Sequence, residues 1–331
     1  MRSGDNPILS DKDMALIQQA LAYPNVGHEH FDFENGSFLL SRQSGDKATP
    51  VTRQIMAQDI LVQPTNAQTR LPGAEADVPL FRVYMRGEAG QEWDHLGLRV
   101  PFAGIGSNSA QDVMRQKFMN YDPGTSFQVP ILQARMEDHN VVHGAFVGGK
   151  GPVPATLARV PGNECSITVG LYDIPTLQHL TGTEPNYDGV MVDAPVRMAG
   201  GSSFDRIMAY VAVWGGITRD GKNPIPLTAI PQDVGSLNPE SLDAILGYAR
   251  QMTAANIHCN SEFIIGHSDA QPGIDEETKN RRTETRLVRT REIFEKHSVG
   301  TAIRGDRIFS STVGRRADVQ DWGPKPEYRP R

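Results

Sequence analysis

The chain has 331 residues, 38% of them hydrophobic, and a formal net charge of −6 at neutral pH. This length and apolar content allow a sizeable core, and they make about two domains the natural expectation. The acidic balance argues against a general nucleic-acid binder and against a protein that binds anionic membranes, because both are usually basic.

The sequence shows no export signal and no membrane span. Its first residues lack a basic segment followed by an apolar one, and they lack a small-residue cleavage site. The longest apolar run, 207–217, is shorter than the roughly 20 residues that a bilayer requires. We therefore expect a protein that is made in the cytoplasm without a signal peptide.

Two elements are predicted near the N-terminus. Ser10 and Asp13 have the spacing of a capping box, and apolar residues follow at helical spacing as far as Pro24. A short amphipathic helix is expected there. Asn35-Gly36 lies between alternating apolar residues, which predicts a β-hairpin at that dipeptide.

The residues up to 215 predict a β-rich body with short helices. Ser109 and Asp112 have capping-box spacing, which predicts a helix that reaches about Asn120. The run 204–213 fits a helix or a strand equally. Strands are expected at the short apolar runs 80–86, 96–102, 127–132, 141–147, 167–172 and 189–192. We expect this body, residues 1–215, to dock on other subunits or to oligomerise.

A linker at 216–224 is expected to connect the body to a C-terminal domain over 225–315. Asn238-Pro239 predicts a helix start, and apolar residues recur on one face after it. The expected order is strand 225–230, a helix from 238, strand 262–266, helix 276–297 and strand 307–310. The chain is therefore predicted to be α+β, with a β-rich body followed by a C-terminal α/β sandwich of βαβαβ order.

This C-terminal region resembles the OmpA-like domain, which holds outer-membrane proteins, lipoproteins and flagellar stator proteins on peptidoglycan. The resemblance rests on 237–240 with the helix after it, on Gly266 to Asp269 for the family's Gly-His-Thr-Asp, and on Thr283 with Arg286 for its Ser-x-x-Arg. It covers about a third of the chain. Lys279 and Arg282 stand where the family has Asn and Leu.

The resemblance implies a binding site for the diaminopimelate of the peptidoglycan stem peptide. Asp269 would accept from the ligand's ammonium group, and Arg286 would pair with its carboxylate through two hydrogen bonds. His267 and Thr283 are implied to belong to the same site. We therefore expect a non-enzymatic structural protein that binds peptidoglycan without a cofactor.

A wall-binding domain without an export signal needs another route to the periplasm. We expect a component of a phage tail, baseplate or related injection particle, which acts at the periplasmic cell wall as part of a virion or injection particle. Two alternatives remain. The protein is a wall-targeted peptidoglycan hydrolase, whose carboxylates or histidines then cluster in a cleft, or it is an assembly protein that uses the OmpA-like fold only as an interaction surface.

Other motifs predict no further chemistry. The stretch 144–151 has P-loop spacing as far as Lys150, but Gly151 stands where Ser or Thr should hold magnesium. The sequence 267–269 contains the residue types of a hydrolase triad, yet three consecutive residues cannot point at one another as a triad must. No nucleotide site and no catalytic residue is therefore predicted.

Two histidine pairs, His28 with His30 and His139 with His143, could each offer two imidazoles to a metal ion. The second pair falls on a predicted strand and lacks the glutamate of the His-Glu-x-x-His motif, so neither pair predicts a metal site.

Cys165 lies in a stretch rich in proline and glycine, and Cys259 precedes a predicted strand. We expect two free thiols rather than a disulfide. The proline-rich tail, 316–331, is expected to lie extended on a neighbouring subunit or to be disordered in isolation.

Overall fold

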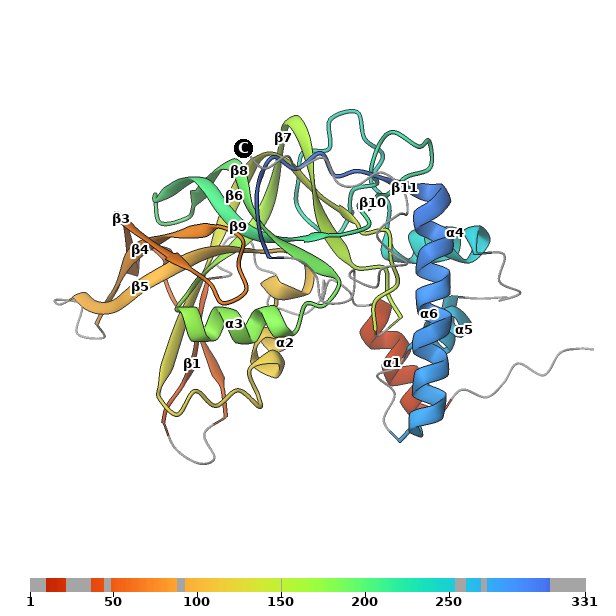
Figure 1. The fold of residues 1–331 in the computed structure, drawn as a ribbon, viewed down its shortest axis with the longest axis horizontal. Coiled ribbons are helices and arrows are strands. Elements are labelled where there is room, and N and C mark those ends of the chain that lie inside the picture. The colour runs from red at the N-terminus through yellow and green to blue at the C-terminus, as the bar shows by residue number, and fades with distance from the viewer. Residues whose placement is uncertain are drawn as a thin grey trace, which may run out of the picture.

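The computed structural model describes residues 10–21, 37–44, 49–87, 93–149, 151–253, 260–268 and 273–309. Within these ranges the protein combines a large β-sheet with a group of helices beside it (Figure 1). The predicted α+β class is confirmed. No helix in these ranges is both long enough and apolar enough to cross a bilayer.

The strands are β1 (Phe38–Arg42), β2 (Val51–Gln54), β3 (Ile60–Arg70), β4 (Asp77–Arg86), β5 (Trp93–Gly104), β6 (Phe127–His143), β7 (Ala155–Tyr172), β8 (Tyr187–Met198), β9 (Ser203–Ala212), β10 (Gly216–Ile217), β11 (Ser298–Val299) and β12 (Gly305–Phe309). The α-helices are α1 (Asp11–Leu21), α2 (Gln111–Lys117), α3 (Ile174–Gly182), α4 (Leu242–Met252), α5 (Asn260–His267) and α6 (Glu276–His297). Two short 3₁₀ helices are η1 (Ala57–Asp59) and η2 (Gly106–Ser109).

Five strands close into a barrel. β6 pairs with β7, β7 with β5, β5 with β9, β9 with β8, and β8 pairs again with β6. All these pairings are antiparallel except that of β5 with β9. Closure satisfies the backbone groups that a sheet edge would otherwise leave unpaired.

Both faces of these strands are buried, as the alternation of side chains along a strand allows. One face contributes Leu132, Val169 and Ala209 to a large apolar cluster. The other face packs Phe102 and Met208 against helices α2 and α3. The barrel therefore carries two hydrophobic cores, one on each side of its wall.

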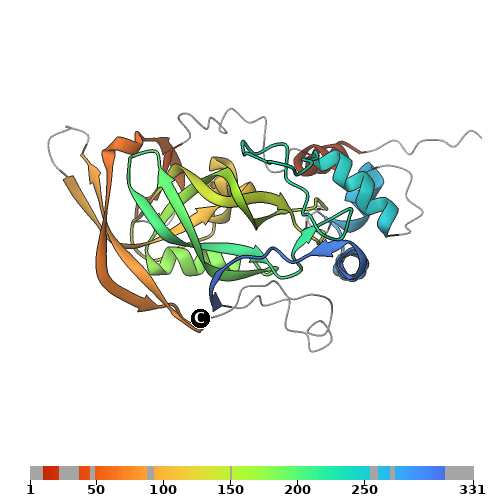
Figure 2. The same cartoon turned by 90° about the horizontal axis from the view of Figure 1, so that it is seen from above.

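Strand β5 is long enough to belong to two structures. Its first half pairs with β4, which pairs with β3, and its second half enters the barrel beside β7. Figure 2 shows the three-stranded ribbon of β3, β4 and β5 extending from the barrel at the end opposite the helices. The strands predicted at 80–86 and 96–102 are confirmed as parts of β4 and β5.

The N-terminal helix begins as predicted. The Asp13 amide donates to Ser10 Oγ at 3.1 Å, and the Ser10 amide donates back to Asp13 Oδ2 at 3.2 Å. These reciprocal bonds form the capping box. Leu16 and Ile17 are buried in the same apolar cluster as residues of α4, α5 and α6. The predicted hairpin at Asn35-Gly36 lies outside the described residues.

The predicted C-terminal α/β sandwich is wrong. The expected strand 262–266 lies inside helix α5, where Phe263 and Ile264 pack against Ile245 of α4 and Ile293 of α6. A five-residue apolar run carries no period of its own, so the surrounding helices decided its conformation. The expected first strand, 225–230, forms only two isolated bridges, from Pro226 to Val142 of β6 and from Leu227 to Glu240.

The last strand also belongs elsewhere. β12 covers most of the predicted strand 307–310, but it pairs with β8 of the barrel wall. Gly305 fits there because a Cβ would meet the Met191 carbonyl oxygen, and Gly189 leaves space for the ring of Phe309. Strand β12 therefore extends the main sheet, while β11 pairs with β10 in a separate two-stranded sheet.

Helices α2 and α4 begin at other residues than predicted. Ser109 does not cap a helix, because its hydroxyl donates to the Gly104 carbonyl at 3.0 Å, and α2 begins after Ala110 without a side-chain cap. Helix α4 begins after Ser241, which accepts from the Ala244 amide at 3.2 Å, and not at Asn238-Pro239. The ambiguous run 204–213 is almost entirely strand β9.

Candidate functional site

The predicted peptidoglycan-binding residues occupy two helices. His267 is the last residue of α5, at the end of a helix where a strand end was expected. Thr283 and Arg286 lie on α6 and are half-buried. Asp269 lies outside the described residues, so the expected contact between Asp269 and Arg286 remains a prediction.

The histidine pair His139 and His143 is buried on β6, and His28 and His30 lie outside the described residues. Among the residues that the structure describes, no three His, Cys, Asp or Glu side chains are grouped so as to hold a metal ion. Cys165 is a buried free thiol, and burial raises its pKa to about 12.

A different group of polar side chains meets where β5, α2 and α3 end. Asn108 comes from η2, directly after β5; Lys117 is the last residue of α2; and Glu184 follows α3. Asn108 Nδ2 donates to Glu184 Oε1 at 3.0 Å. Lys117 Nζ donates to Asn108 Oδ1 at 2.6 Å and also to Glu184 Oε1. Each of the three side chains is thus bonded to the other two.

This triad of Asn108, Lys117 and Glu184 is largely withdrawn from water. The side chains of Lys117 and Glu184 are 17% and 11% exposed, and Asn108 is buried. Burying opposite charges is tolerated because each compensates the other and both are hydrogen-bonded. The three groups are therefore held in one arrangement before any ligand arrives.

Some hydrogen-bonding groups of the triad have no partner within it. Within the described part of the chain, both bonds to Glu184 fall on Oε1 and none falls on Oε2. Lys117 uses two of its three N–H donors, and the Asn108 amide nitrogen uses one of two. One carboxylate oxygen and two N–H groups thus have no partner within the triad.

Glycine at 104 lets the chain turn sharply enough to bring Asn108 into place. A Cβ on Gly104 would lie 2.4 Å from Thr168 Oγ1 and 2.9 Å from the Asn108 carbonyl oxygen. Gly106, the first residue of η2, has a φ of +54°, which side chains disfavour. Only glycine fits this close approach of η2 to β7.

Helix α3 is held at both ends. At its start, Asp173 accepts from the Thr176 amide at 2.9 Å and pairs with Arg99 of β5 at 2.8 Å. Near its end, the His179 ring donates from Nε2 to the Lys117 carbonyl at 2.7 Å, because a carbonyl oxygen can only accept. These contacts hold the loop with Glu184 against the end of α2.

A buried tyrosine of β9 supports the same loop. Thr181 Oγ1 donates to the Leu177 carbonyl at 2.9 Å, so the proton in its 3.0 Å contact with Tyr210 comes from the phenol. Burial raises the pKa of Tyr210 well above its usual value, and the Glu184 carboxylate adds to that effect. Tyr210 therefore stays neutral and anchors the C-terminal turn of α3 on the barrel.

Sequence reasoning missed this triad because its members are far apart in the chain. Asn108 and Glu184 are 76 positions apart, and Lys117 and Glu184 are 67 apart. One local signal was available. The stretch Gly104-Ile105-Gly106-Ser107-Asn108-Ser109 follows a predicted strand, and a glycine-rich turn after a strand often lies at a binding site.

Comparisons with known proteins leave the family open. No protein-family model matches the chain, and no curated protein matches it. Among solved structures, a γ-glutamyl cyclotransferase aligns with 56% of this chain and 99% of its own, with 14% identity and a TM-score of 0.28. A likeness at that TM-score supports no statement about function.

The resemblance to the OmpA-like domain is therefore wrong. No family model matches the region that carried it. The segment that would form the family's central strand is the helix α5, and the last strand pairs with the barrel. Short motifs such as Gly-His-Ser-Asp fit more than one backbone conformation, so they did not determine the fold.

Proposed function

We propose that the protein is an enzyme that acts on a small polar substrate at Glu184. The observation that carries this proposal is the open Oε2 oxygen of a carboxylate whose other oxygen is held by Lys117 and Asn108. A fixed carboxylate with one free oxygen is suited to take up a proton from a substrate. This proposal departs from the non-enzymatic function expected from the sequence.

The open donors indicate what the substrate carries. A substrate oxygen, from a carbonyl or a carboxylate, would accept from the free N–H groups of Lys117 and Asn108. A neighbouring amine or water would lose its proton to Glu184 Oε2 and attack the carbonyl carbon of an amide. Glu184 would then return that proton to the leaving nitrogen as the C–N bond breaks and the amine is released. The expected substrates are therefore small amides, such as dipeptides and amino-acid amides.

The test is turnover of a panel of α- and γ-linked dipeptides and amino-acid amides, with released amines measured by mass spectrometry. We expect the wild type to release an amine and Glu184→Gln to be slower by about 100-fold or more, the usual contribution of general base catalysis. Glu284→Gln, an exposed position on α6, is the matched control and should leave the rate unchanged. Equal rates for wild type and Glu184→Gln would contradict the proposal.

Peptidoglycan binding in a virion or injection particle stays a prediction, and it no longer has an OmpA-like fold to support it. Co-sedimentation of the full chain with purified diaminopimelate-type sacculi, beside Arg286→Ala, tests it independently of turnover. Pelleting of the wild type alone would revive that function, and a wild type that remains soluble would exclude it.

A further inference from the structure

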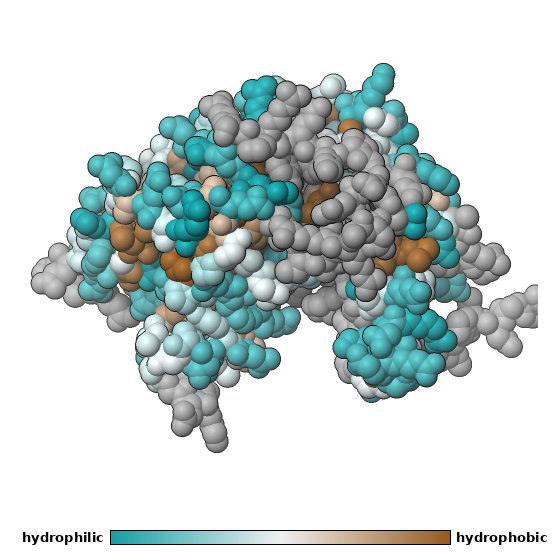
Figure 3. Space-filling view, in the orientation of Figure 1, coloured by the Kyte–Doolittle hydropathy of each residue, from teal (hydrophilic) through white to brown (hydrophobic). Residues whose placement is uncertain are grey.

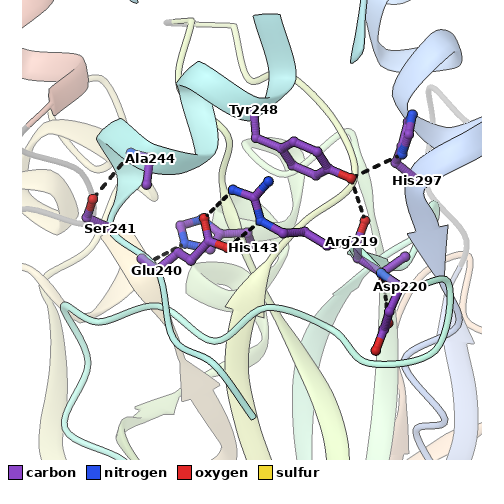
Figure 4. A network of polar contacts seen from close by, with 9 residues as sticks. His143, Arg219, Asp220, Glu240, Ser241, Ala244, Tyr248 and His297 are labelled. Carbon is purple, nitrogen blue, oxygen red and sulfur yellow. Dashed lines mark hydrogen bonds and ion pairs between the residues drawn. The ribbon is translucent and has the colours of Figure 1, made fainter. Parts of the chain in front are cut away.

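A second polar network lies away from the triad, where the segment 216–240 crosses the end of β6 (Figure 4). Arg219 pairs with Glu240 through two bonds, Nε to Oε1 at 2.5 Å and Nη2 to Oε2 at 2.7 Å. The Arg219 guanidinium also lies 3.9 Å from the ring centroid of Tyr248 on α4. These contacts join both ends of the segment to each other and to α4.

The same network reaches α6. Tyr248 donates from its hydroxyl to the Thr218 carbonyl at 3.2 Å, and its oxygen lies 3.2 Å from His297 Nδ1. The Thr218 amide donates to the His297 carbonyl at 2.9 Å. The segment 216–240 is thus held between the barrel and the helices α4 and α6.

His143 lies beneath this segment and is almost completely buried. Its Nε2 donates to the Glu240 carbonyl at 3.0 Å, and its backbone amide donates to the Ile225 carbonyl at 3.0 Å. Because Nε2 carries the proton, Nδ1 of the neutral ring is an acceptor. That Nδ1 atom is buried and has no hydrogen-bond partner among the described residues.

Burial, and not the charges around it, disfavours a second proton on the His143 ring. Burial lowers the pKa of His143 to about 4, and the Glu240 carboxylate opposes this only in part. Glu240 is itself neutralised by Arg219, whose bonds hold the pKa of that carboxyl below its usual range. The network also contains Tyr248, His297 and Asp220. Burial lowers the pKa of His297, and bonds from the amides of Asn223 and Lys222 hold the pKa of Asp220 far below its usual range.

We propose that His143 is an acid-sensitive latch, which keeps the segment 216–240 closed on β6 at neutral pH and releases it when the imidazole ring is protonated. A proton on Nδ1 would create a buried charge and a donor without an acceptor. Opening of the segment exposes the ring to water, which solvates the positive charge and accepts a hydrogen bond from Nδ1.

The direction of the effect follows from proton uptake on opening. An exposed histidine binds a proton below a pH of about 6.5, whereas the closed form binds it only near pH 4. Between these values each opening event takes up one proton, so the open fraction grows about tenfold for each unit by which the pH falls. From pH 6.5 to 4.5 the expected gain is about 40-fold, because the open form is already half protonated at pH 6.5.

Hydrogen exchange on the full chain tests the latch. The Leu227 amide donates to the Val141 carbonyl and the His143 amide donates to the Ile225 carbonyl, so both amides exchange when the segment opens. We expect their protection factors to fall about 40-fold between pH 6.5 and 4.5, relative to amides in the β6–β7 ladder. In His143→Gln, which keeps an N–H for the Glu240 carbonyl but cannot be protonated, protection should stay constant. The same fall in both proteins would overturn the proposal.

A second measurement needs no variant. The chain contains nine histidines, and their ring protons can be titrated by NMR. The ring of His143 is assigned separately from that of His139, because burial lowers the pKa of His139 as well. The His143 ring should stay unprotonated while the segment is closed and shift only in the pH range in which the amides of Leu227 and His143 lose protection. If all nine rings titrate near their ordinary pKa while those two amides stay protected, the latch does not exist.

Discussion

Single residues decide the geometry of the triad. Glu184, Lys117 and Asn108 are ordinary surface residue types in composition, and only their positions make them a site. Asn108 reaches Glu184 because Gly104 has no Cβ, and Lys117 reaches it because His179 holds the carbonyl of that same residue. The chemistry therefore depends on residues that themselves make no contact with the open Oε2 oxygen.

The first prediction concerns Gly104. In Gly104→Ala the new methyl group would meet Thr168 Oγ1 and the backbone of Asn108, so η2 must shift. We expect a loss of about 1–3 kcal/mol in the free energy of unfolding, the usual cost of overpacking. Chemical denaturation measures this loss. Gly182→Ala, at the end of α3 with no atom within 4 Å of the added Cβ, is the control and should not be destabilised.

The second prediction concerns the ion pair of the triad. Lys117→Met removes the ammonium and leaves the Glu184 carboxylate buried with one fewer donor, which should cost about 1–3 kcal/mol. Arg70→Met is the matched control, because Arg70 and Asp77 are 59% and 44% exposed and such pairs contribute about 0.2–1 kcal/mol. Thermal melts of both variants measure how much stability each substitution removes. A smaller loss for Lys117→Met than for Arg70→Met would show that the triad is not structurally coupled.

At the scale of single helices and strands, the elements that a segment packs against decide its conformation more than its own residue pattern does. The sequence of α5 predicts a strand because Phe263, Ile264 and Ile265 are consecutive and apolar. In the structure two of them are buried between α4 and α6, while Gly266 faces solvent. A helix satisfies its own backbone hydrogen bonds, which suits a segment that has no neighbouring strand to pair with.

The third prediction tests the conformation of α5. Gly266 is exposed, and a Cβ added to it would meet no atom within 4 Å. If the segment is helical, Gly266→Ala should raise the free energy of unfolding by about 0.5–1 kcal/mol, and Gly266→Val should raise it less. In a strand the order would be reversed, because valine is the better strand former. Urea denaturation of the two variants gives the order directly.

At the scale of the whole molecule, the two ends of the sequence build one structure. Leu16 of α1, Trp214 after β9 and Phe263 of α5 share one apolar cluster. On the face shown in Figure 3 most of the described surface is polar, and the main apolar area lies at the left, over the ribbon of β3, β4 and β5, where Leu61, Trp93 and Leu98 are exposed. Strand β12 also connects the C-terminal residues to the barrel, because it pairs with β8.

The fourth prediction follows from this sharing. Residues 1–215 and 216–331, produced separately, should each fail to give a cooperative thermal transition, because each would expose its half of the shared cluster. Circular dichroism during heating measures the transition. A cooperative melt of the isolated 216–331 fragment would contradict this prediction and support an independent C-terminal domain.

The sequence by itself determined the features that depend on neighbours within a few positions. The capping box at Ser10, the apolar stripe of α4 and the alternating strands β4 and β5 are of this kind, because caps and periodicity are local. Only the tertiary structure decided that α5 is a helix, that β12 joins β8, and that Asn108, Lys117 and Glu184 meet. The physical reason is that these outcomes depend on pairing and burial between residues far apart in the chain, and no local pattern encodes which distant surface a segment will find.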